Sequence, residues 1–129
     1  SLSKEVRRVG VPPNPIALKP GVTTGPIIGS TWDPIIDHTS FVADSVLDMI
    51  LVSTAPSNRP LGAPGTLLCD VSLQLFPPLS TLPGTSFSLA IPDQLHVLLG
   101  LDLYTQGASL DSSGAFHLTN ALDLTLGLF

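Results

Sequence analysis

Apolar and polar residues alternate along the last part of the chain. From Leu122 to Leu128 every second residue is leucine, and Asp123, Thr125 and Gly127 lie between them. A period of two is typical of a β-strand with one buried face. Two further strand-like runs, Thr85–Ile91 and Leu101–Leu110, come before it, and a turn at residues 111–114 precedes the closing strand. This pattern predicts β structure over the last third of the chain.

The upstream segments continue the same pattern of short strands separated by loops rich in proline and glycine. The strand-like segments are Ile27–Asp37, with Pro34 at a bulge or an edge, Ser45–Ser53 and Thr66–Phe76. Ser45–Ser53 is compatible with a helix, but its Val, Ile, Leu and Met residues favour a buried strand. Asp93–Leu98 is predicted to form one helical turn. The chain is therefore expected to be all-β, a single β-sandwich of about seven strands, immunoglobulin-like or jelly-roll-like.

The N-terminal segment does not share this pattern. Ser1–Val11 has no core-building periodicity, and the prolines that follow exclude a regular helix. We interpret residues 1–25 as an extended, basic and proline-rich arm with a short strand at Ile16–Leu18, and residues 26–129 as the β-sandwich domain. A disordered tail is the alternative interpretation of the arm.

The composition is apolar but poor in charge. Hydrophobic residues are 43% of the chain, aromatic residues 5% and charged residues 12%, and the mean hydropathy is +0.44. This balance indicates an aliphatic core, an uncharged polar surface and some apolar surface covered by another chain. The longest apolar run, Val97–Leu101, is far shorter than the roughly 20 residues of a membrane-spanning helix, so the protein is not expected to span a membrane.

Charge is distributed unevenly along the chain. Residues 1–20 carry four basic residues against Glu5, a net charge of +3, whereas residues 21–129 carry Arg59 against nine aspartates, a net charge of −8. The acidic domain would repel phosphate, so nucleic acid is not an expected partner. The basic arm is expected to contact an acidic protein surface, on its own chain or on a neighbour.

Several features favour an extracellular setting. The chain begins at Ser1 without a methionine and shows no signal peptide, which predicts a processed, secreted or cell-surface protein. Its thirteen prolines and five Lys and Arg residues would limit cleavage by trypsin-like proteases. Cys69 is the single cysteine, which excludes an internal disulfide and predicts a small buried apolar side chain.

Several segments, taken in order, carry a family resemblance. They are GPIIGSTWD (residues 25–33), LVST (51–54), LGAPGTLLCDVS (61–72), SFSLAIPDQLHVLLGLDLYTQGASLD (86–111) and TNALDLTLG (119–127). Over about residues 25–129 the chain resembles a β-sandwich domain of secreted and surface bacterial proteins, often a C-terminal module, with the patterns LGxPG, LPIPNDPALLGLxLYxQ and TNALxLxIG. The family usually has a cysteine directly after LGxPG, where this chain has Thr66. The resemblance implies a non-catalytic accessory or surface domain, and it carries no catalytic residues over.

No residue pattern predicts an enzyme or a cofactor. His38, His96 and His117 lack the spacing of a metal site, and no serine lies in a Gly-x-Ser-x-Gly motif. The scattered aspartates lack the order of a calcium loop. Trp32 is expected in the core or as a lid. With Tyr104, which alternates with polar residues on an outward sheet face, it forms a small candidate platform for a ligand.

Two functional hypotheses follow. The first is a structural subunit of an extracellular filament or assembly, with copies joined head to tail because the arm packs on, or adds a strand to, a neighbouring subunit. The subunit-interface residues are then Lys4, Val6, Arg7, Arg8, Val9, Val11, Ile16 and Leu18. The second is a non-catalytic module that binds glycans or other surface proteins through Trp32 or Tyr104. Whether the arm is exchanged or folds back on its own domain stays open.

Overall fold

The main sheet is built around the three longest strands of the chain. A computed structural model describes residues 1–129, and in it β5 (Ser45–Ser53), β10 (Asp102–Asp111) and β11 (Phe116–Thr125) lie side by side. β1 (Lys4–Arg8) adds to β11 at one edge and β8 (Leu79–Thr81) adds to β5 at the other, in the order β1-β11-β10-β5-β8. All four pairs are antiparallel.

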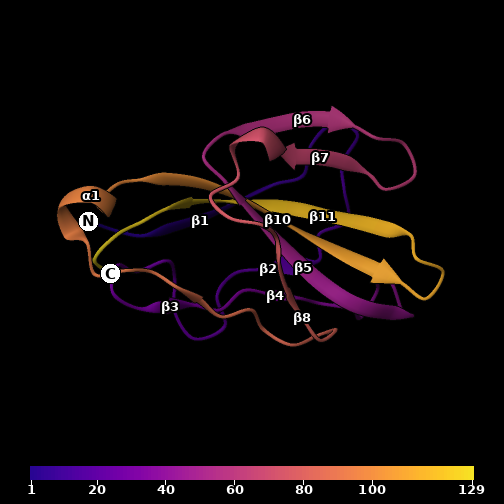
Figure 1. Ribbon diagram of the computed structural model, residues 1–129, viewed down its shortest axis with the longest axis horizontal. Coiled ribbons are helices and arrows are strands. Elements are labelled where there is room, and N and C mark those ends of the chain that lie inside the picture. The colour runs from indigo at the N-terminus through magenta and orange to yellow at the C-terminus, as the bar shows by residue number, and fades with distance from the viewer.

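Shorter strand pairs cover the two faces of this sheet (Figure 1). On one face lie β2 (Leu18–Lys19) with β4 (Ile35–Ile36), and β3 (Thr31–Trp32) with β9 (Leu89–Ala90). On the opposite face lies the hairpin of β6 (Pro56–Pro60) and β7 (Thr66–Cys69), followed by the 3₁₀ turn η1 (Val71–Leu73). The all-β sandwich prediction is confirmed, with seven strands of three or more residues and four of only two.

The principal core lies between the main sheet and the β2–β4 and β3–β9 pairs. It contains 13 buried hydrophobic residues, of which only Trp32, Phe41 and Phe87 are aromatic. Ile50 and Val52 of β5 point into it, and so do Leu122, Leu124 and Leu126, as the alternation predicts. Leu128, the last leucine of that alternation, lies beyond the end of β11 and is 46% exposed. A smaller cluster of Leu51, Ala108 and Leu118 lies on the opposite face, against the β6–β7 hairpin.

A β-bulge opposite Gly107 allows β11 to contribute leucines to the hydrophobic clusters on both faces of the main sheet. Gln106 pairs with Ala121 but Ala108 pairs with Leu118, so Thr119 and Asn120 together lie opposite Gly107. Leu118 and Leu122 would share a face in a regular strand, and the extra residue places them on opposite faces. A Cβ atom on Gly107 would lie 2.9 Å from Ile36 Cδ1 and from Thr119 Oγ1, so any larger residue at the bulge would force these buried side chains to move.

Several predicted strands are shorter than the apolar runs that indicated them. Ser45–Ser53 is one strand over its whole predicted length, whereas residues 27–37 contain only β3 and β4, interrupted at Asp33 and Pro34. Residues 66–76 form β7 and then η1, because Asp70 caps the 3₁₀ turn through the amide of Ser72. Residues 85–91 contribute only β9. The strands β1, β6 and β8 lie in segments expected to be arm or loop.

The one α-helical turn, α1 (Leu95–Leu98), lies close to both chain termini at one end of the molecule (Figure 1). It falls within the predicted Asp93–Leu98 turn. At four residues it is too short to cross a membrane, and no longer helix exists in the chain.

Candidate self-association surface

The N-terminal arm folds back on its own domain. Within the chain, β1 pairs antiparallel with β11 along five residues, from Lys4 opposite Thr125 to Arg8 opposite Ala121. The amide of Ser3 donates to the carbonyl of Phe129 at 2.7 Å and extends the contact beyond the strand. β1 is therefore the edge strand of the main sheet, and its second edge is unpaired.

Arg8 fastens the end of β1 to three other strands. Its Nε donates to Asp123 Oδ2 at 2.8 Å and its Nη2 to Asp123 Oδ1 at 3.0 Å, which is the two-point geometry of an arginine–carboxylate pair. The same guanidinium donates to the carbonyls of Ser57 in β6 and Leu68 in β7. One of the four positive charges of the arm is thus paired with an aspartate of its own domain.

Glu5 holds the middle of β1 to the opposite layer. Its Oε1 accepts a hydrogen bond from the indole Nε1 of Trp32 at 2.5 Å and from the amide of Gly21 at 2.7 Å. In the sequence Glu5 is only the one negative charge of a basic segment. Nothing in the local pattern identifies it as the partner of Trp32, because the two residues belong to different layers.

Two buried asparagines bind the second half of the arm into the core. Asn14 donates to the carbonyls of Thr66 and Thr119 at 2.7 and 2.8 Å, and its Oδ1 accepts from the amide of Thr66. Asn120 Oδ1 accepts from the amides of Ala17 and Leu18. Asn14, Ala17 and Leu18 are therefore buried in the sandwich, although Ile16 between them stays exposed.

The predicted interface residues fall into three groups by exposure. Leu18 is 1% exposed and belongs to the core, while Arg8 and Val9 are half-buried. Val6, Val11 and Ile16 are 55%, 76% and 46% exposed. Lys4 and Arg7 are exposed and form no salt bridge within the chain. Lys4, Val6 and Arg7 therefore lie together on an uncovered strand at the sheet edge.

The two predicted ligand-contacting aromatic residues do not share a surface. Trp32 is 1% exposed in the principal core, where it packs with Leu103. Tyr104 is next to Leu103 in β10 and so points to the opposite face, where it is half-buried. The structure does not bring them together into one stacking platform.

Cys69 is fully buried in β7, as expected. Its Sγ lies 3.4 Å from the carbonyl oxygen of Tyr104. Burial raises the pKa of the thiol to about 12, so it stays protonated at neutral pH and is a poor nucleophile.

A second cluster joins His38 to Asp48 of β5, and the spacing of these residues in the sequence does not indicate it. His38 Nε2 lies 2.8 Å from Oδ1 of the fully buried Asp48, and His38 Nδ1 lies 2.6 Å from the Phe41 carbonyl. Burial lowers the pKa of His38, but these two acceptors raise it by more, and the net pKa is above its ordinary value of 6.5. Both ring nitrogens face acceptors, so neither is placed to take a proton from a serine.

The remaining partners of Asp48 complete this cluster. Ser109 Oγ and the amide of Gly84 each donate to the carboxylate at 2.9 Å, and Ser45 Oγ donates to it at 3.3 Å. These bonds join β5, β10 and the loop before β9, which gives the buried charge a structural role. No group of three or more His, Cys, Asp or Glu side chains is placed to hold a metal ion.

Comparison with known proteins adds no relative: no protein-family model, curated protein or solved structure matches this chain. The sheet edge formed by β1 contains four of the eight predicted interface residues, Lys4, Val6, Arg7 and Arg8.

Proposed function

We propose that the protein is a non-catalytic structural subunit of an extracellular or cell-surface assembly, in which copies associate head to tail through the N-terminal arm. The observation that carries the proposal is the position of β1. It ends the strand order of the main sheet, so β11 occupies one of its edges and the other edge is free to pair. An unpaired edge strand is a ready template for a strand of another chain.

The opposite edge of the same sheet supports a repeating contact. β8 is the last strand at that side and pairs only with β5. Because β1 and β8 are different surfaces, joining β1 of one copy to β8 of the next leaves a free edge at each end. A contact of this kind is heterologous and extends into a chain of subunits.

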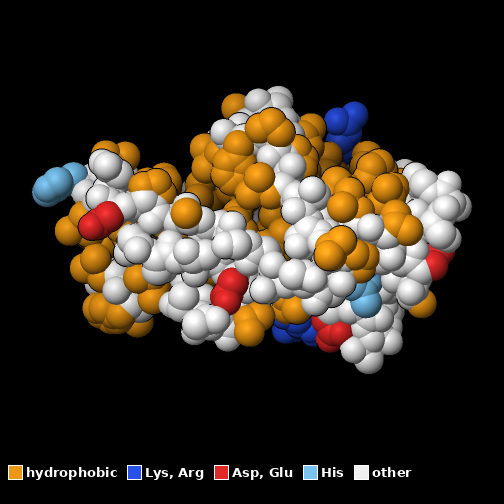
Figure 2. All heavy atoms as spheres, turned by 60° about the horizontal axis from the view of Figure 1, so that its bottom comes forward, with side chains coloured by type: hydrophobic (Ala, Val, Ile, Leu, Met, Phe, Trp, Pro, Cys, Tyr) orange, Lys and Arg blue, Asp and Glu red, His pale blue; other side chains and the backbone are white.

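β8 has only three residues, so most of the apolar and charged contacts between two copies would come from side chains in and next to β1. Val6 is exposed, and Leu2, just before the strand, is 64% exposed, so both can bury apolar surface on a neighbour. Lys4 and Arg7 are free to meet the excess of aspartate in residues 21–129. Figure 2 shows broad apolar areas with few charged groups between them, a surface that favours association.

The hydrogen bonds of Arg8 and Glu5 favour association through the outer edge of β1 over exchange of the arm between copies. They hold β1 on its own domain, so the strand stays in place and presents its outer edge instead of being exchanged. Asn14, Ala17 and Leu18 are buried, so removal of the whole arm would damage folding and assembly together. Substitution of exposed side chains of β1 separates the two effects.

The test combines light scattering after gel filtration with negative-stain electron microscopy. We expect the wild-type chain to form linear oligomers as its concentration rises. A triple variant, Lys4→Glu, Val6→Lys and Arg7→Glu, should remain monomeric with an unchanged circular dichroism spectrum. Val71→Lys, which adds a charge to η1 at a similarly exposed valine, is the matched control and should assemble like the wild type.

Two outcomes would contradict the proposal. A wild-type chain that stays monomeric at every concentration would exclude self-association. Oligomers formed equally by the wild type and by the triple variant would show that copies meet through another surface.

A further inference from the structure

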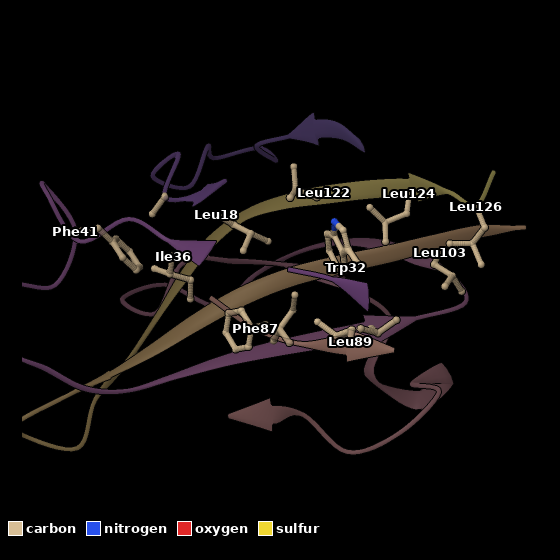
Figure 3. Packing of buried hydrophobic residues seen from close by; sticks show 13 residues of the cluster. Leu18, Trp32, Ile36, Phe41, Phe87, Leu89, Leu103, Leu122, Leu124 and Leu126 are labelled. Atoms are coloured by element: carbon tan, nitrogen blue, oxygen red, sulfur yellow. The ribbon is translucent and has the colours of Figure 1, made fainter. Parts of the chain in front are cut away.

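An apolar cavity lies between the main sheet and the β3–β9 pair. Its volume is about 150 Å³, and twelve of its thirteen lining residues are hydrophobic. The buried part of its wall is formed by Trp32, Val52, Leu89, Leu103, Leu124 and Leu126. Figure 3 shows Trp32 between Leu124 of β11 and Leu89 of β9, with Leu103 beside them. The cavity is thus bounded by both layers of the sandwich and is continuous with its core.

The buried wall offers no free hydrogen-bonding side chain. Trp32 carries the only polar atom among these six side chains, and its indole N–H is already donated to Glu5. Water needs two or more polar partners to occupy a site of this size, so the side chains of the buried wall hold water poorly. For the same reason the hydroxyl groups of a sugar would lose their hydrogen bonds on entering it.

We propose that this cavity binds a small, uncharged apolar molecule, of the size of a single aromatic ring or a short alkyl chain. An engineered apolar cavity of about 150 Å³ in another protein stays dry and binds benzene. A ligand of six to eight non-hydrogen atoms, on the order of that volume, would regain the dispersion contacts that the empty cavity lacks. This proposal is independent of self-association, because the β1 edge does not line the cavity.

The cavity has a mouth through which such a ligand can enter. Leu75 and Leu101, which also line it, are 52% and 37% exposed, and Ala90 is exposed as well. An apolar rim around an apolar interior excludes charged ligands on the way in. Entry therefore needs no opening of the principal core.

Trp32 provides the measurement, because it is the only tryptophan and forms part of the wall. The full chain is titrated with benzene while Trp32 fluorescence is recorded and chemical shifts of leucine methyl groups are followed by NMR. Benzene should give a saturable change with a Kd on the order of a millimolar, as expected for six non-hydrogen atoms. Pyridine has the same shape but a ring nitrogen that needs a hydrogen-bond partner, and it should bind at least tenfold more weakly.

A matched pair of variants locates the binding. Ala90→Phe places a ring at the mouth, and Ala115→Phe adds the same ring at an exposed turn outside the cavity. We expect benzene affinity to fall at least tenfold in the first and to be unchanged in the second. The absence of a saturable change in the wild type, equal affinity for benzene and pyridine, or equal affinity in the two variants would overturn the proposal. The comparison of ligands in the wild type remains decisive if Ala90→Phe does not fold.

Discussion

Arg8 and Asp123, 115 positions apart in the sequence, form a two-point ion pair between the N-terminal and C-terminal strands of the main sheet. Their side chains are 28% and 26% exposed, so the pair is only partly screened by solvent. Through the carbonyl oxygens of Ser57 and Leu68, which Arg8 also reaches, the same side chain fastens β1 to the β6–β7 hairpin.

Arg8→Ala should lower the free energy of unfolding by about 2 kcal/mol, because four charge-assisted hydrogen bonds are lost. Arg8→Lys should recover only part of this, since an ammonium group cannot reproduce the planar fork. Equilibrium unfolding in urea measures both. Arg7→Ala is the control, because Arg7 is exposed and forms no salt bridge, and it should change stability by less than about 0.5 kcal/mol. Equal losses in the two alanine variants would contradict the assigned role of Arg8.

Asn14→Ala should cost about 2–4 kcal/mol, because it leaves the buried amide of Thr66 without an acceptor. Asn58 offers a comparison of the same residue type at the surface. Its side chain also bonds to the backbone, accepting from the amide of Val11 and donating to its carbonyl, but these groups are exposed. Asn58→Ala should therefore cost less than about 1 kcal/mol. In thermal and urea unfolding, Asn14→Ala should be clearly less stable than Asn58→Ala. If Asn58→Ala were the less stable variant, the hydrogen bonds of Asn14 could not have the stabilising role assigned to them.

The pair of His38 and Asp48 should make stability depend on pH. The pKa of His38 is raised above 6.5 in the folded state, so the folded protein binds its proton more tightly than the unfolded chain does. The stabilisation is fully present below the unfolded pKa of 6.5 and is lost as pH rises through the higher folded pKa. The stability difference between wild type and His38→Gln should therefore be largest below pH 6.5 and should shrink as the pH rises above it.

His96→Gln serves as the control for this titration, because His96 is exposed on α1 and forms no salt bridge. Its stability should parallel that of the wild type at every pH. If the His38→Gln difference were constant with pH, the folded and unfolded pKa values of His38 would have to be equal.

Val42 is the only residue other than glycine with a positive φ, at 48°. This conformation is strained for a β-branched side chain and natural for glycine. Val42→Gly and Val42→Ala both remove the packing of the side chain, so their difference reports the backbone alone. We expect the glycine variant to be more stable than the alanine variant by about 1 kcal/mol, opposite to the usual order. Urea unfolding of the two variants measures this difference, and an alanine variant of equal or greater stability would exclude the strained conformation.

The candidate site could be predicted only in part. The charge asymmetry singled out Lys4, Arg7 and Arg8, and the structure places the first two on an exposed sheet edge. The same pattern could not show that Arg8 bonds within the chain while its neighbour Arg7 does not. Adjacent residues of a strand point to opposite faces, and which face has a partner depends on layers that pack from elsewhere in the chain.

The sequence by itself determined the all-β class, the strand Ser45–Ser53, the buried face of Leu122, Leu124 and Leu126, and the burial of Cys69. These follow from a period of two and from the cost of exposing aliphatic side chains, which act locally. Only the tertiary structure decided the bulge at Gly107, the bond between Glu5 and Trp32, and the cavity beside Trp32. Each of these depends on contacts between residues far apart in the chain. Such contacts do not change the local alternation of apolar and polar residues, so the sequence pattern does not reveal them.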